Sequence, residues 1–143
     1  MIKEYVVTFL FTLNMNRIWL IEKQKPDWQK GCLNGIGGKV EKGELPLAAA
    51  IRELKEEAGI DKMNLWELGY MFGTNNDSTE FKVWIYTGIT DLELKTMEEE
   101  QVSLKYINEV KTYKCIENVP MLIEACSYKL IGHSHFNRLI MEY

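Results

Sequence analysis

The chain has 143 residues, enough for one domain of ordinary size, and its 46% hydrophobic and 27% charged residues are a globular composition. It carries 17 basic and 21 acidic residues, a net charge of −4, so it lacks the basic excess of a general nucleic-acid binder. Three cysteines without a CxxC pair argue against a disulfide framework or a zinc site and favour a cytoplasmic setting, and the apolar N-terminal stretch is too short to span a membrane.

The pattern of apolar residues predicts six strands, most of them in hairpins. Val, Ile, Phe and Leu dominate each segment, and short polar turns separate the first segment from the second and the third from the fourth. The predicted strands are residues 4–13, 17–24, 65–74, 79–89, 101–107 and 134–142. Trp19, Trp66 and Trp84 alternate within these strands and are expected to pack in the core.

Two segments are predicted to be helical. The first runs from Leu47 to Ala58, with Pro46 in its first turn and Gly59 as its C-cap. The second runs from Val119 to Ile131 after Asn118, a good N-cap residue. The expected buried residues are Leu47, Ala50, Ile51, Leu54 and Ala58 in the first helix and Leu122, Ala125, Cys126 and Leu130 in the second. Hairpins combined with two helices predict an α/β/α sandwich with a mixed sheet, in a single domain over residues 1–143.

The first helix also carries Glu53, Glu56 and Glu57 on one face, within a single turn. One interpretation is a solvated charged face, because runs of charge usually lie on the surface. Arg52 and Lys55 would then reduce the repulsion between the glutamates. The other is a site for a hard cation. Mg²⁺ and Mn²⁺ prefer oxygen ligands and are commonly held by a few carboxylates together with the phosphates of a substrate.

The segment before the helix favours the cation site. Its closely spaced glycines leave backbone N–H and carbonyl groups accessible to a metal or a phosphate. After Gly38 come five residues, Glu44, seven residues and then RELKEEAGI, which ends at Ile60. This stretch resembles the complete signature of the Nudix hydrolase family, GX5EX7REUXEEXGU, in which U is a bulky aliphatic residue.

The resemblance implies the α/β/α Nudix fold over essentially the whole chain. It also implies a hydrolase that uses Mg²⁺ or Mn²⁺ to direct water at a phosphorus atom of a nucleoside diphosphate derivative. Glu56 and Glu57 match the principal metal ligands of the family, and the carbonyl of Gly37 is the expected backbone ligand. Glu53 matches a position that either binds metal or acts as general base, and the sequence leaves both roles open.

Further residues are expected around this centre. Arg52 is expected to organise the site by pairing with carboxylates such as Glu44 and Glu56. Lys39 either assists a phosphate leaving group or is an ordinary surface lysine. Many family members take another metal ligand or the base from a later loop, and here the candidates are Glu98, Glu99 and Glu100, the last two being assigned to the metal site.

Other positions indicate how a nucleotide is recognised. Asn34 resembles an asparagine of the mammalian oxidised-purine nucleoside triphosphatases, and Glu117 and Asn118 lie where MutT-type enzymes place base-reading side chains. Plainer interpretations are a turn residue for Asn34 and an N-cap for Asn118. Gly38 and Lys39 are expected to contact the phosphates. The candidates for stacking on a base are Trp28, Phe72 and Phe81, although each can equally be core or rim.

Together these features predict a Mg²⁺-dependent nucleoside triphosphate pyrophosphohydrolase. Its expected substrate is a purine dNTP or 8-oxo-dGTP, cleaved to the monophosphate and pyrophosphate. The alternatives are another nucleoside diphosphate derivative, such as a nucleotide sugar, ADP-ribose or a dinucleotide, and a nucleotide sensor without turnover. We expect a monomer or homodimer with no nucleic-acid or membrane partner, and we expect His133 and His135 to form a strand-edge pair without a metal.

Overall fold

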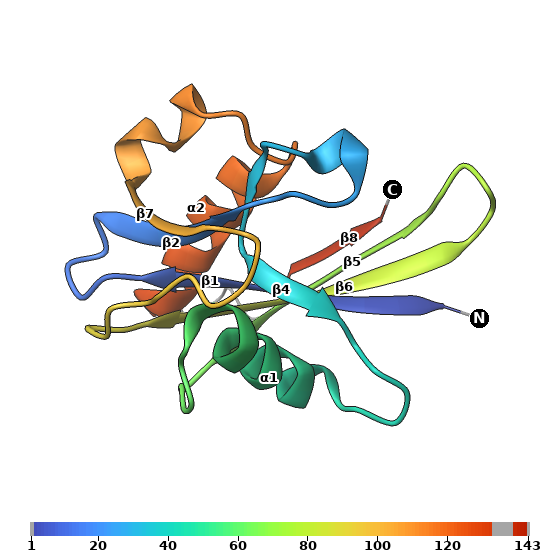
Figure 1. Cartoon of the computed structure of the whole chain (residues 1–143), viewed down its shortest axis with the longest axis horizontal. Helices are drawn as coiled ribbons and strands as arrows, with labels where there is room; N and C mark the ends of the chain where they lie inside the picture. The colour runs from blue at the N-terminus through green and yellow to red at the C-terminus, as the bar shows by residue number, and fades with distance from the viewer. Residues whose placement is uncertain (1, 133–138, 143) are drawn as a thin grey trace.

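The computed structural model describes residues 2–132 and 139–142 of the chain (Figure 1). The helices and strands of these residues, in chain order, are β1 (Lys3–Phe11), β2 (Arg17–Glu22), η1 (Asp27–Gln29), β3 (Leu33–Asn34), β4 (Ile36–Lys39), α1 (Pro46–Ala58), β5 (Trp66–Thr74), β6 (Glu80–Ile89), β7 (Val102–Tyr106), η2 (Ile107–Thr112), α2 (Val119–Leu130) and β8 (Leu139–Glu142). The elements η1 and η2 are 3₁₀-helices.

The strands form one mixed sheet in the order β3-β2-β1-β6-β5-β8, with β4 added to β1 and β7 to β2. The pairs β1–β6 and β5–β8 are parallel, and the other pairs are antiparallel. Strand β1 lies against β6 along its whole length, whereas its other edge is shared. On that edge β4 pairs with residues 5–8 and β2 pairs with residues 10–11.

The helices cover the two faces of this sheet. Side chains alternate along β1, so Val7 and Phe9 join the core cluster that contains the α2 residues Leu122 and Cys126. Leu10 points to the other face and packs with α1. Figure 1 shows α1 below the strands and α2 on the other side of them. The predicted α/β/α sandwich with a mixed sheet is therefore confirmed.

Both predicted hairpins are present, since β1 pairs with β2 and β5 with β6. Strand β7 and both helices lie where the pattern placed them, within one residue at each end. Of the predicted strand 134–142, residues 139–142 form β8, and the remainder, with His133 and His135, lies outside the described residues. None of the helices in the described ranges has the length and apolar character needed to cross a membrane.

Two predictions about packing are wrong. Leu47 was expected in the core but is 44% exposed, because the buried face of α1 is centred on Ala50, Leu54 and Ala58 and includes Ala49 instead. Ile51 is only partly buried. Trp66 is 51% exposed, because it is the first residue of β5 and lies at the end of the sheet.

The glycine-rich segment lies outside the six predicted strands but forms β3 and β4. Glycine is uncommon in strands, so the local sequence did not indicate one here. Gly37 lies opposite Val7 in the β1–β4 ladder, and a Cβ atom at Gly37 would collide with the carbonyl group of Val6. Glycine is therefore required at this position by the close approach of β1, and not by a turn.

Candidate functional site

Arg52 on α1 holds the carboxylates of the site together. Its guanidinium group binds Glu44 through two hydrogen bonds, from Nε to Oε2 at 2.8 Å and from Nη2 to Oε1 at 3.0 Å. Nη1 donates to Glu53 at 2.8 Å and to Glu56 at 3.2 Å. The Arg52 guanidinium holds the pKa of Glu44 below its usual range. The expected pairing of Arg52 with Glu44 and Glu56 is therefore present, and Glu53 belongs to the same network.

The same arginine joins the helix to the glycine strand. Nη2 of Arg52 donates to the carbonyl oxygen of Lys39 at 2.9 Å, which ties α1 to the end of β4. Beside this contact the Glu53 carboxylate lies directly against Gly38, where a Cβ atom would collide with it. A glycine at position 38 thus lets a charged side chain of α1 reach the strand backbone.

Glu57 is the buried member of the glutamate cluster. Its side chain is 5% exposed, and its Oε1 atom is buried without a hydrogen-bond partner. Burial, followed by the hydrogen bond and charge of Glu53 and then the charge of Glu100, raises the pKa of Glu57 to about 8. Two carboxylates this close disfavour each other's charge, so the pair is a place where a bound cation would be stabilising.

In the described part of the chain, no three or more Asp, Glu, His or Cys side chains are grouped so that they could hold a metal ion on their own. Glu56 faces Arg52 and has a side chain that is 46% exposed, whereas Glu53 and Glu57 are turned inward. A partial set of carboxylates of this kind can serve a hard divalent cation that takes its other ligands from water and substrate.

Of the three loop glutamates, Glu100 is turned inward, whereas Glu98 and Glu99 are exposed. Glu100 accepts a hydrogen bond from Lys23 Nζ at 3.0 Å and another from the Gln24 backbone N–H at 2.6 Å, and its charge acts on Glu57. Glu99 instead faces outward, with a side chain that is 69% exposed and an ion pair of 4.0 Å to Lys25. Glu98 is also exposed. The assignment of Glu99 to the metal site therefore finds no support in the geometry.

Lys23 is a residue of this site that no sequence pattern indicated. This lysine follows the end of β2, and no local pattern distinguishes it from the other lysines of the chain. It reaches the site because the β2–β7 ladder, in which Ile21 pairs with Val102, brings the end of β2 beside Glu100. Only knowledge of that strand pairing would have revealed it.

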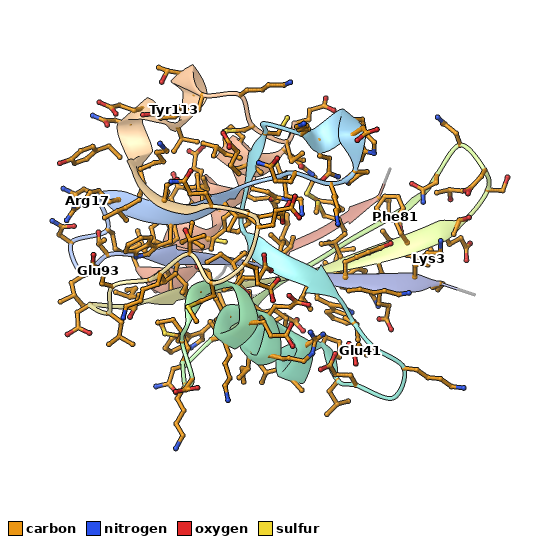
Figure 2. All side chains as sticks on the ribbon, in the orientation of Figure 1. Lys3, Arg17, Glu41, Phe81, Glu93 and Tyr113 are labelled. Carbon is orange, nitrogen blue, oxygen red and sulfur yellow. The ribbon has the colours of Figure 1, made fainter. Side chains whose placement is uncertain are left out.

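A cleft of about 710 Å³ opens on the α2 side of the sheet. Strand residues, including Val7, Met71 and Val83, form its apolar part, and β4 contributes Gly37 and Gly38. Figure 2 shows Phe81, which also lines the cleft, at the end of the sheet that carries Lys3, with Arg17 and Glu93 at the opposite end. The predicted substrate residues that line the cleft are Asn34, Gly38, Lys39, Glu117 and Asn118.

Two segments far apart in the sequence form the polar wall of the cleft. The Leu33 N–H donates to the Lys114 carbonyl at 2.8 Å, and the Ile116 N–H donates to the Leu33 carbonyl at 3.0 Å. These two bonds place Asn34 next to the segment 116–118. The Asn34 side chain accepts a hydrogen bond from the Gly35 N–H at 2.8 Å.

Asn118 occupies the N-cap position of α2, but its side chain makes no capping hydrogen bond. Its Nδ2 atom lies 2.9 Å from Met71 Sδ, inside the cleft lining. Asn118 is therefore the N-cap residue by position, as predicted, but its side chain does not cap the helix. Among the candidate stacking residues, Trp28 and Phe81 line the cleft, whereas Phe72 does not. Trp28 is 73% exposed, which is unusual for an indole that only packs.

Comparisons with known proteins agree with this fold. Residues 3–118 match a family model described as the NUDIX domain. The NUDIX domain of Shewanella oneidensis NrtR, solved with ADP ribose, is 16% identical, with a TM-score of 0.78 over 91% of this chain and 89% of that one. A MutT structure from work on Aliivibrio salmonicida and Vibrio cholerae is 26% identical, with a TM-score of 0.68 over 89% of this chain and 98% of that one.

A curated relative, the methanol dehydrogenase activator of Bacillus methanolicus, is 36% identical over 55 residues. This match spans 38% of the present chain and only 30% of the relative. The family model covers most of the chain, and the glutamates and Arg52 that it includes are assembled in one cluster. The chain belongs to the Nudix hydrolase family.

Proposed function

We propose that the protein is a Mg²⁺-dependent nucleoside triphosphate pyrophosphohydrolase of the MutT type. Its substrate is a purine deoxynucleoside triphosphate, with 8-oxo-dGTP as the leading candidate, and its products are the monophosphate and pyrophosphate. One observation supports this proposal above the others. The strand β4 lines the nucleotide-sized cleft with Gly37 and Gly38, and the same Gly38 contacts the glutamate cluster through Glu53.

The residues of the cluster fit a divalent cation, which Nudix hydrolases generally use. The Oε1 atom of Glu57 is buried beside Glu53 and accepts no hydrogen bond. A carboxylate oxygen in this environment is a suitable ligand for a hard cation. We assign Glu53, Glu56, Glu57 and the Gly37 carbonyl to the cation, with Glu100 within reach. A cation held there neutralises phosphate charge and acidifies a water molecule.

The chain's own side chains perform the remaining steps. Lys39 and Lys23, both in the cleft lining, bind the anionic phosphates. The oxygen of the attacking water forms a bond to phosphorus, a bridging P–O bond breaks and pyrophosphate leaves. A carboxylate of Glu53 or Glu100 accepts the proton of that water. Arg52 does not touch the substrate but keeps Glu53 and Glu56 in position.

The aromatic and polar residues that line the cleft are suited to a purine base. Phe81 and Trp28 offer aromatic faces, and Asn34, Glu117 and Asn118 offer amide and carboxylate groups for the ring edge. A site that hydrogen-bonds a particular ring substituent rejects analogues without it, because its own polar groups are then left unpaired. These side chains are therefore our choice for discriminating an oxidised from an unmodified purine.

The test is a set of initial rates with Mg²⁺ on dGTP, 8-oxo-dGTP, the other dNTPs, ADP-ribose, a nucleotide sugar and a diadenosine polyphosphate, with the products resolved. The expected result is pyrophosphate release with the highest kcat/KM for 8-oxo-dGTP. Asn118→Ala and Asn34→Ala should lower that preference. A linked diphosphate as the best substrate would leave the catalytic assignments standing and refute the assignment of the base pocket.

A second candidate substrate class is a nucleoside diphosphate linked to another group. It is favoured by a further hollow of about 560 Å³ that adjoins the cleft at Trp28 and Asn75 and is lined by Thr74, Asn76 and Asp77. A substrate with a second moiety would have room there, whereas a triphosphate would not need it. Two monophosphate-ended products in place of pyrophosphate would identify this class.

A further inference from the structure

Lys23 and Glu100 form the most enclosed lysine–glutamate pair of the described residues outside the Arg52 network. Their side chains are only 18% and 16% exposed, and Nζ lies 3.0 Å from Oε1. The other oxygen, Oε2, accepts the Gln24 backbone N–H at 2.6 Å. Each oxygen of Glu100 thus accepts one hydrogen bond, and the lysine ammonium group offsets the negative charge that would otherwise attract a cation.

The two partners differ in how freely they can move. The Glu100 carboxylate is held independently of the lysine, because its Oε2 atom accepts the Gln24 backbone N–H at 2.6 Å. Lys23 reaches Glu100 through a flexible chain of four methylene groups, so its ammonium group can shift without moving the backbone. The lysine is therefore the part of the pair that can leave.

Lys23 also lies where a second anion, a phosphate group of a nucleotide, could reach it. It lines the same cleft as Gly37, Gly38 and Lys39, where the phosphates of a nucleotide would lie. Its charge acts on Glu57 as well, in the direction opposite to that of Glu100. A phosphate that attracts the ammonium group would therefore uncover one oxygen of Glu100 and strengthen the negative potential around Glu57.

We propose that Lys23 is a latch on Glu100. In the nucleotide-free protein the lysine neutralises Glu100. When substrate phosphates occupy the cleft, the Lys23 ammonium group pairs with them instead. Glu100 Oε1 is then available to a cation held at the Glu53–Glu57 pair. This proposal rests on the proposed function for the identity of the anion. Lys23 is then a positioning residue that links nucleotide binding to cation binding, so that each ligand increases the affinity for the other.

The first test measures Mn²⁺ binding to the nucleotide-free protein by isothermal titration calorimetry. Lys23→Met removes the latch and should tighten Mn²⁺ binding by about fivefold or more, the usual lower range for coupled sites. Lys23→Gln loses the same charge, and it replaces the Met variant if that one does not fold. Lys25→Met is the matched control, because Lys25 has an 84% exposed side chain and only a 4.0 Å ion pair. Unchanged or weaker Mn²⁺ binding in both Lys23 variants would overturn the proposal.

A second test separates the latch from a general effect of removing a positive charge. In a Glu100→Gln background, Lys23→Met should leave Mn²⁺ affinity unchanged, since there is no carboxylate left to release. A through-space effect of the lysine on the cation would persist in that background and would refute the latch.

The third test uses α,β-methylene-dGTP as a non-hydrolysable probe. This nucleotide should increase the Mn²⁺ affinity of the wild-type protein more than that of Lys23→Met, in which Glu100 is already free. An equal increase in both proteins would contradict the proposal. The Mn²⁺ measurements without nucleotide do not depend on which nucleotide is the substrate, so failure of the proposed function and failure of the latch give different results.

Discussion

Replacing Glu57 with Gln is expected to change activity and stability in opposite directions. The Glu57 side chain is 5% exposed, its Oε1 lacks a partner, and both burial and Glu53 disfavour its charge. An amide has the same shape without the charge, and its NH₂ group can donate to Glu53. The substitution thus removes the proposed cation ligand and, in the metal-free protein, removes the cost of burying an ionisable carboxyl group.

The expected sizes follow from this environment. With a pKa of about 8, Glu57 keeps a proton in the folded protein at neutral pH that the unfolded chain releases, and removing this cost should raise the free energy of unfolding by about 1–2 kcal/mol. For a chain of 143 residues this corresponds to an increase in Tm of about 3–6 °C. We expect kcat/KM to fall at least ~1000-fold, or roughly 4 kcal/mol of transition-state stabilisation.

The assay is differential scanning calorimetry in EDTA and in Mg²⁺, with initial rates on the best substrate alongside. Saturating Mg²⁺ should stabilise the wild-type protein, by about 2.7 kcal/mol at 100 times its Kd, and should not stabilise Glu57→Gln. Glu124→Gln makes the same chemical change on an exposed position of α2 and should behave like the wild type. If Glu57→Gln has a lower Tm in EDTA and is still stabilised by Mg²⁺, or if it keeps near-full turnover, Glu57 is not a ligand of the metal.

Three other substitutions test separate parts of the site. Gly38→Ala puts a methyl group against the Glu53 carboxylate and should reduce Mn²⁺ affinity about 10–100-fold, with an unchanged circular dichroism spectrum. A normal Mn²⁺ affinity in calorimetric titration would show that the contact is unimportant. Arg52→Lys cannot bind Glu44 with two parallel hydrogen bonds and should lower kcat about 10–100-fold, and a variant with wild-type rates would argue against an organising role. Asn118→Ala should lower kcat/KM for 8-oxo-dGTP about tenfold or more while changing that for dGTP less, and equal losses on both substrates would exclude base reading by this residue.

The features that the sequence predicted correctly are those determined by neighbours in the chain. The helix α1 follows from its 3.6-residue period, from Pro46 at its start and from Gly59, which has φ of 74° in the C-cap. The contact of Arg52 with Glu56 is a pair four residues apart on that helix. Such pairings require no knowledge of the rest of the fold.

The features that sequence analysis could not place depend on contacts between distant segments. Glu98, Glu99 and Glu100 are equivalent in sequence, and only the attachment of this segment to β2 brings Glu100 inward beside Lys23. Similarly, the strand β4 exists because β1 offers it a ladder, although its own glycines oppose strand formation. The burial of Glu57 is a further example, since charged residues on a helix are usually exposed.

The two backbone hydrogen bonds of Leu33 also have a consequence for how new specificity can arise. They fasten the polar wall at 116–118 to β3, whereas the glutamates of α1 are fastened to β4 by Arg52. The wall and the glutamates are thus mounted separately on two consecutive short strands, and each can be exchanged without rebuilding the other. Grafting a different 116–118 segment onto this scaffold should therefore redirect substrate choice while preserving the hydrolytic step, which makes this wall the natural starting point for engineering.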